Sequence, residues 1–165
     1  ARYVIPGLHA NATTPLTITS GLIYYIPIFV AETTTYTQIS IEVTTGVAGG
    51  FISLRIFNWL AGVPGSLVLN AGQVTTDVAA VKNITISQQL TRGYYYLAYR
   101  TDKAGVAVTC LDPGQAQFAP VPGFHRLNLL PPSQLVLTVS AAFADPAPAP
   151  TLSSNAYVAV LLREN

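Results

Sequence analysis

The chain has 165 residues, of which half are hydrophobic and only 9% are charged. An average soluble domain has about 25% charged residues, so a surface this poor in charge is one that partner proteins are expected to cover. The 8 basic and 7 acidic residues leave a net charge of +1, which provides no basic surface for nucleic acid or for anionic lipid. The longest apolar runs, residues 21–31 and 135–144, are shorter than the ~20 residues that a membrane span requires, so we expect no membrane insertion.

The N-terminal residues show little periodicity of either helix or strand. Residues 1–15 contain two prolines among small, polar and apolar residues in no regular order. We therefore predict an extended arm over residues 1–15, which reaches a partner subunit, and a single domain over residues 16–165. The chain is long enough for that domain to bury a core of its own.

Two segments, residues 36–44 and residues 51–59, alternate between polar and apolar positions. Such alternation predicts strands with one buried face. The side chains predicted to face the core are Ile39, Ile41, Val43, Ile52, Leu54 and Ile56. In the second segment Arg55, Phe57 and Trp59 lie on the opposite face, which makes this face both aromatic and charged.

Turn-forming residues follow at short intervals along the chain. Pro and Gly predict a turn over residues 61–66, with a return strand at residues 67–69. The remaining strands are expected at residues 16–19, 21–30, 81–90, 94–100, 106–111, 135–139 and 156–162. Many short strands with turns between them are typical of sandwiches and barrels. We predict an all-β fold, an antiparallel β-sandwich of jelly-roll-like form.

Prolines concentrate in two stretches of the second half, residues 120–132 and residues 145–150. In the second stretch Pro occupies every other position, which favours a stiff, extended segment. Too few residues follow this segment to form another domain. We therefore expect residues 145–150 to form a Pro-rich loop that crosses the top of the sandwich.

The residues that usually carry catalysis are scattered. His9 and His125 have no neighbouring ligand at metal spacing, and the lone Cys110 sits in an apolar strand as a small buried hydrophobe. The carboxylates are Glu32, Glu42, Asp77, Asp102, Asp112, Asp145 and Glu164. We expect no metal, no cofactor and no enzymatic activity. A glycan-degrading enzyme stays a remote alternative, because two carboxylates need only be ~5–10 Å apart in space.

Aromatic residues are the strongest candidates for a binding site. The chain has nine Tyr, six Phe and one Trp, and such rings stack on sugar faces while Tyr hydroxyls donate hydrogen bonds. The candidates are Tyr24, Tyr25, Tyr36, Trp59, Tyr94, Tyr96 and Tyr99. Trp59, Tyr94 and Tyr96 are predicted to bind ligand, because they face away from the expected core. The alternative for these rings is the core itself or a subunit interface.

The outward faces of two strands also predict self-association. Phe57 and Trp59 lie beside Arg55 on one strand, while Tyr94 and Tyr96 follow Arg92 on the other. Arg and aromatic side chains are enriched at the centres of interfaces. We therefore predict an interface whose contact residues are Arg55, Phe57, Trp59 and Arg92.

Several segments of the first two-thirds of the chain resemble virion surface proteins of tailed bacteriophages. The resemblance begins with GLIYYIPIFVAETTTY at residues 21–36 and includes GVPGSLVL at residues 62–69 and GYYYLA at residues 93–98. It also covers residues 54–58, 71–72 and 82–90. The modules in question are β-sandwich domains of tail-fibre, receptor-binding and head-decoration proteins.

The resemblance implies a place on the exterior of a phage particle, assembled in the host cytoplasm with other virion proteins as partners. Two functions fit that place. The chain is expected to be a tail-fibre or adhesin module that binds host-surface glycan, or else a decoration protein that docks on capsomers and stabilises the head. Because phage fibres and decoration spikes are commonly trimeric, the resemblance also favours a homotrimer over the default dimer.

Overall fold

The computed structural model describes residues 3–4, 8–9, 13–111, 117–118, 136–153, 157–158 and 160–164, and these form strands and loops without a helix. No helix of this described part could therefore span a membrane. The strands are β1 (Tyr3–Val4), β2 (Leu8–His9), β3 (Thr13–Thr17), β4 (Leu22–Val30), β5 (Thr34–Thr45), β6 (Phe51–Leu60), β7 (Val63–Thr75), β8 (Ala80–Leu90), β9 (Gly93–Thr101), β10 (Ala107–Leu111), β11 (Gln117–Phe118), β12 (Val136–Ser140), β13 (Thr151–Ser153), β14 (Tyr157–Val158) and β15 (Val160–Glu164).

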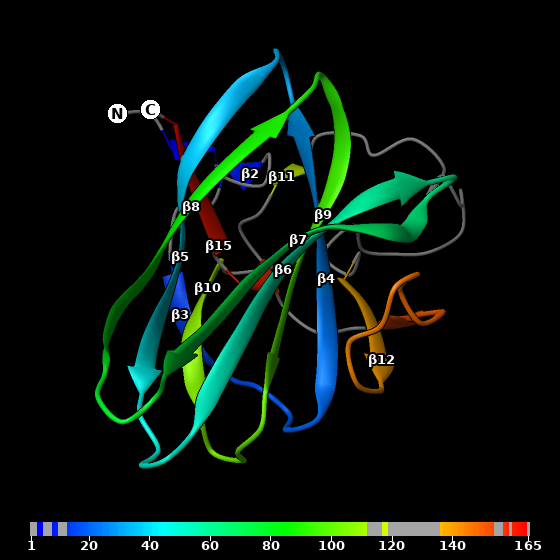
Figure 1. Ribbon diagram of the computed structural model, residues 1–165. Helices are drawn as coiled ribbons and strands as arrows, with labels where there is room; N and C mark the ends of the chain where they lie inside the picture. Colours follow the sequence, from blue (N-terminus) through cyan, green and yellow to red (C-terminus); the bar gives the residue numbers. More distant parts are fainter. Residues whose placement is uncertain are drawn as a thin grey trace.

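Strands β3 to β10 form two antiparallel sheets that pack face to face (Figure 1). The β5 sheet has the order β3-β10-β5-β8, and the β9 sheet has the order β4-β9-β6-β7. Apart from β6 and β7, which form a hairpin within one sheet, consecutive strands from β3 to β10 lie in opposite sheets. This is the connectivity of a jelly roll. The prediction of an all-β, antiparallel, jelly-roll-like sandwich is confirmed.

The C-terminal strands extend both sheets of this jelly roll. In the β9 sheet, β12 pairs with β4 and β13 pairs with β12. In the β5 sheet, β15 pairs with β5 next to β10, and β1 pairs with β15. Strand β4 is therefore an interior strand of its sheet. Its residues are buried on both faces, which explains why its apolar residues form an almost continuous run rather than an alternation.

The N-terminal boundary differs from the predicted one. Strand β3 begins at Thr13, and Thr13–Thr17 pairs with Leu111–Ala107 of β10. Three residues of the predicted arm therefore belong to a sheet, and Tyr3–Val4 also pairs with β15. Pro15 is tolerated in β3 because this strand lies at the edge of the sheet, where a missing N–H leaves no ladder bond unmade.

The turn predicted over residues 61–66 is shorter than expected. Strands β6 and β7 are joined by Ala61 and Gly62 alone, with φ values of 47° and 94°. Two consecutive positive φ angles are typical of the tight turns whose twist matches that of a hairpin. Pro64 and Gly65 instead belong to β7, which accepts a proline because it forms the edge of its sheet.

The main core fills the space between the two sheets. The predicted inward residues Ile39, Ile41, Val43, Ile52, Leu54 and Ile56 are all buried there, together with Tyr95, Leu97 and Tyr99 of β9. Tyr24 and Tyr99 stack within this core with their ring centroids 4.8 Å apart. Cys110 is buried in it as a small hydrophobe, as predicted.

A second, smaller cluster covers the outer face of the β9 sheet. Its buried residues are Ile23, Tyr25, Phe57, Tyr96 and Ala98, and residues 139–147 pack over them through Val139, Ala141, Phe143 and Ala147. The Leu67 backbone N–H donates to Asp145 Oδ1 and the Ala147 N–H donates to the Gly65 carbonyl, both over 2.9 Å. The Pro-rich loop at residues 145–150 thus lies along an outer face of the sandwich, whereas the sequence predicted that it crosses the top.

Candidate functional site

The pairing of three strands arranges the outer aromatic residues in rows. Phe29 of β4 is opposite Tyr94 of β9, and Trp59 of β6 contacts Tyr94 from the other side. In the next row Tyr96 lies between Pro27 and Phe57. Because side chains in a strand alternate between faces, both rows lie on the outer face of the β9 sheet.

The first row forms a partly exposed surface of three rings, which we call the aromatic platform (Phe29, Tyr94 and Trp59). The ring centroids of Phe29 and Tyr94 are 4.8 Å apart, and those of Tyr94 and Trp59 are 5.2 Å apart. Phe29 is 45% exposed, while Tyr94 and Trp59 are half-buried. The predicted ligand residues Trp59 and Tyr94 are therefore neighbours, and both reach the surface.

Tyr96, the third predicted ligand residue, is fully buried and cannot contact a ligand. Its hydroxyl donates a hydrogen bond of 2.6 Å to the Gly62 carbonyl in the β6–β7 turn. Its ring is nearly parallel to that of Trp59, at 4° and 5.1 Å between centroids. Tyr96 thus orients Trp59 and ties the hairpin to the sheet, so the prediction is corrected from a binding role to a supporting one.

Phe29 was not singled out from the sequence. It belongs to the apolar run of β4, in which all residues are buried except the half-buried Leu22 and the exposed Phe29. A run without alternation does not reveal which of its members is exposed. The pairing of Phe29 with Tyr94 was the missing information, and only the tertiary fold provides it.

The predicted subunit interface is largely covered by the chain itself. Phe57 is fully buried, and its ring is stacked on Phe143 at 6.1 Å and 24°. Arg55 is half-buried, with its guanidinium carbon 4.4 Å from the Phe143 ring centroid. Of the four predicted contacts only Arg92, in the turn before β9, is exposed, and Trp59 is shared with the aromatic platform. Phe57 is therefore a residue of an intramolecular cluster and not of a subunit interface.

The remaining tyrosine candidates do not reach the surface. Tyr24, Tyr36 and Tyr99 lie in the main core, and Tyr25 lies in the outer cluster. Burial raises the pKa of Tyr99 well above its ordinary value, and it raises the pKa of Tyr36, to which the nearby Glu164 also contributes. These rings act in packing, as the alternative prediction held.

Several carboxylates hold turns and loops in place. Asp77 accepts the Gly49 backbone N–H at 2.6 Å, and Asp102 accepts the Phe51 N–H at 2.7 Å. Asp145 anchors the Pro-rich loop as described above. His9 is part of β2, whereas Asp112 and His125 lie outside the described residues.

Across the ranges that the structure describes, no three His, Cys, Asp or Glu residues gather as a metal would require. No protein-family model, curated protein sequence or solved structure matches the chain. A jelly roll hosts many unrelated functions, so the fold alone assigns none. The features that bear on function are therefore the aromatic platform and the resemblance of sequence segments.

Proposed function

We propose that this chain is a non-enzymatic structural protein on the exterior of a bacteriophage particle, a tail-fibre or adhesin module that binds host-surface glycan. The observation that carries the proposal is the aromatic platform, in which Phe29, Tyr94 and Trp59 are adjacent and partly exposed. The resemblance of residues 21–36 and 93–98 to virion surface modules supports the location.

The platform has the properties that a sugar-binding surface needs. Aromatic rings offer apolar faces for the C–H groups of a sugar, and the Tyr94 hydroxyl adds a polar group at the centre of the row. All three residues lie on strands of one sheet, and Tyr96 fixes the plane of the Trp59 ring. A ligand surface held by strands loses little conformational freedom on binding, which favours affinity.

The proposal is tested by measuring binding of the purified protein to host-surface polysaccharide. Phe29→Ala and Trp59→Ala each remove one ring of the platform, and we expect affinity to fall roughly 5- to 150-fold for each, as a stacking loss of about 1–3 kcal/mol implies. Phe51→Ala is the matched control, because Phe51 is also exposed, at 40%, but belongs to the opposite end of β6. Equal effects of all three variants, or no effect of any, would overturn the platform.

The capsid decoration function stays as the alternative, and the β6–β7 turn favours it. Leu60 is 61% exposed and Val63 is 40% exposed, next to the half-buried Trp59. Figure 1 shows this hairpin projecting sideways from the body of the sandwich. Such a tip suits docking on other virion proteins. An image of the intact particle distinguishes the two, because a decoration protein lies on the head and an adhesin module on the tail.

Self-association, as a homotrimer, belongs to the same proposal. The few charges of the chain and the exposed Leu60 and Val63 leave apolar surface that a second copy would cover. A mass measurement in solution tests it at micromolar concentration. A single 17.5 kDa species would overturn self-association and leave other virion proteins as the partners of this surface.

A further inference from the structure

Strand β8 is a long edge strand of the β5 sheet. Within the described residues it forms a ladder with β5 alone, so the backbone N–H and C=O groups of its other side have no strand there to pair with. Figure 1 shows the first half of β8 at the left margin of the molecule. Such a row of unpaired backbone groups is a template for the addition of another strand, and natural edge strands are usually protected against it.

Other edge strands of the two sheets have this protection. β3 has five residues and contains Pro15, and β13 has three residues. β7 contains Pro64, and its ladder with β6 is interrupted by register shifts. Residues 145–147 also form hydrogen bonds with Leu67 and Gly65 of this strand. Short length, proline, irregular pairing and a covering segment all disfavour the addition of a strand.

β8 lacks most of these features. It has eleven residues, no proline and one charged residue, Lys82. Its ladder with β5 is regular over residues 80–85, and the one register shift follows this stretch. Val81 is 57% exposed on the outer face, while Ile84 and Ile86 are half-buried against the main core on the other face. The edge therefore combines unpaired backbone with apolar side chains on both faces and little charge.

We propose that β8 pairs antiparallel with β8 of a second copy of this chain, which joins the two β5 sheets into one. A two-fold axis at Asn83 keeps the contact within the regular stretch, because Val81 then lies opposite Thr85 of the second copy. Lys82 lies opposite Ile84 of the second copy, so no like charges oppose each other. A contact between two identical surfaces is isologous, and it closes at two copies.

The chemistry of the strand favours a second copy as the occupant of this edge. The outer face of residues 80–85 is neutral, since Lys82 is on the core side, and a neutral strand suits it best. Two opposed Asn83 amides can donate to and accept from each other, as Asn83 already accepts from Gln38 within the chain. Each copy also covers the exposed Val81 of the other, which removes apolar surface from water.

This contact goes beyond the proposed function and does not depend on it. Three-fold association would use the exposed Leu60 and Val63 beside the β6–β7 turn, whereas pairing through β8 is two-fold. The two contacts together would join six copies, and the β8 contact alone joins two. A failure of one is therefore distinguishable from a failure of the other.

The experiment measures the mass of the full chain by sedimentation equilibrium from micromolar to millimolar concentration, because a single strand pair is a small interface. Asn83→Lys places two like charges opposite each other at the axis, and we expect its mass at the highest concentration to be half that of the original chain. Gln73→Lys should keep the original mass. It is the matched control, because Gln73 is exposed on the β7 edge and also forms a side-chain hydrogen bond, to Ser53 at 3.0 Å. Equal masses of the original chain and Asn83→Lys overturn the pairing.

Cross-linking provides a second measurement, which holds even if Asn83→Lys does not fold. Opposed Cα atoms of an antiparallel pair are about 4.5–5.5 Å apart, within the range that a disulfide spans. Asn83→Cys should therefore form a covalent dimer under mild oxidation, with twice the chain mass of 17.5 kDa, and faster than Gln73→Cys. Cys110 is buried in the main core and does not compete. Equal rates of cross-linking in the two variants overturn the pairing.

Discussion

The two outer faces of the sandwich differ in the contacts that their side chains make. On the β5 sheet, Gln38 donates 2.8 Å hydrogen bonds to Ser40 and Asn83 and accepts one from Arg163 at 3.4 Å. These polar groups pair with one another, so this face needs no cover. On the β9 sheet the outer residues are aromatic, and residues 139–147 pack over part of them. On this aromatic face, residues 139–147 cover the outer cluster, whereas the aromatic platform stays partly exposed.

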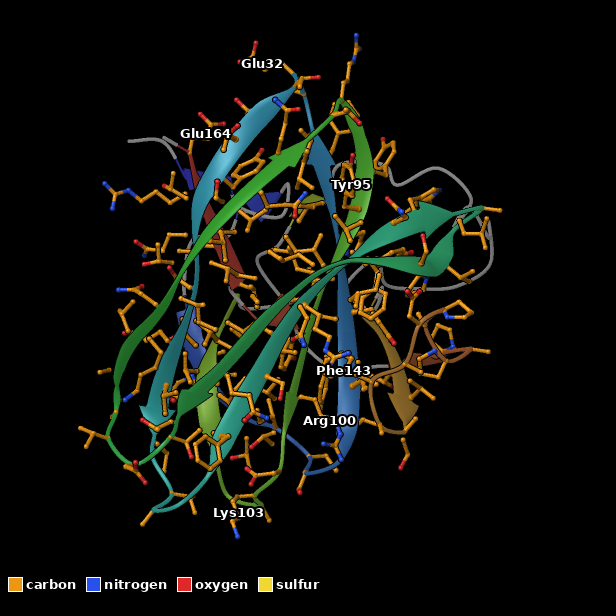
Figure 2. All side chains as sticks on the ribbon, in the orientation of Figure 1. Glu32, Tyr95, Arg100, Lys103, Phe143 and Glu164 are labelled. Atoms are coloured by element: carbon orange, nitrogen blue, oxygen red, sulfur yellow. The ribbon has the colours of Figure 1, made fainter. Side chains whose placement is uncertain are left out.

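The ends of the molecule carry charged residues, with Glu32 at one end and Lys103 at the other (Figure 2). Arg92, in the turn before β9, is also exposed. Between these ends, one outer face carries hydrogen-bonded polar side chains and the other carries packed aromatic rings. Substitutions on the two faces therefore test it directly, because a buried ring and an exposed amide differ greatly in what their removal costs.

The largest effect is expected for Phe57→Ala on the aromatic face. Removing a fully buried ring leaves a cavity beside Phe143 and should lower the free energy of unfolding by about 3–5 kcal/mol. Gln38→Ala, on the polar face, should cost about 1 kcal/mol or less. Urea unfolding of both variants measures the difference. If Phe57→Ala cost no more than Gln38→Ala, the outer cluster would not be a second core.

Phe143→Ala should have a smaller effect, since Phe143 is half-buried. We expect a loss of about 2 kcal/mol in the free energy of unfolding, because the ring packs on Phe57 and carries the guanidinium of Arg55. The variant also exposes Phe57, so it should bind more of a dye specific for apolar surface. A variant as stable as the original chain would contradict the covering role of this segment.

Two tyrosines of the aromatic face should respond to the loss of a hydroxyl with opposite signs. Tyr96→Phe removes the hydrogen bond to Gly62 and should destabilise by about 1 kcal/mol. Tyr25→Phe removes a buried hydroxyl without a partner, so it should leave stability unchanged or raise it by about 1 kcal/mol. Thermal unfolding measures both. A destabilised Tyr25→Phe would mean that its hydroxyl has an acceptor in the free protein.

The smallest effect is expected at the turn that presents Trp59. Ala61 has a φ of 47°, in the left-handed region that costs a residue with a Cβ atom about 1 kcal/mol or more. Ala61→Gly should therefore raise the free energy of unfolding, by about 0.5 kcal/mol after the greater chain entropy of glycine is counted. Ala48→Gly is a control at a residue without a positive φ, where the same change should not stabilise. Chemical denaturation of both variants provides the measurement.

Much of the sandwich follows from local pattern in the sequence. The alternation around Ile39, Ile41 and Val43 predicted a strand with one buried face, and the structure buries all three. The same reasoning placed Arg55 and Trp59 on the opposite face of β6. Boundaries were less accurate where a strand tolerates unusual residues, as at Pro15 and Pro64, because an edge strand does not need the missing N–H.

The sequence by itself determined the all-β class, the inward residues and the aromatic character of one outer face, because these depend on residues two positions apart in one strand. Only the tertiary structure decided which outer rings are covered. Phe57 and Tyr96 belong to a buried cluster against which residues 139–147, more than forty positions further along the chain, pack, with Phe143 on Phe57. Composition predicted that the proline-rich part of this region is stiff, but stiffness does not specify where the segment lies in the fold. The position of this segment depends on hydrogen bonds with Leu67 and Gly65, which form only once the strands have assembled.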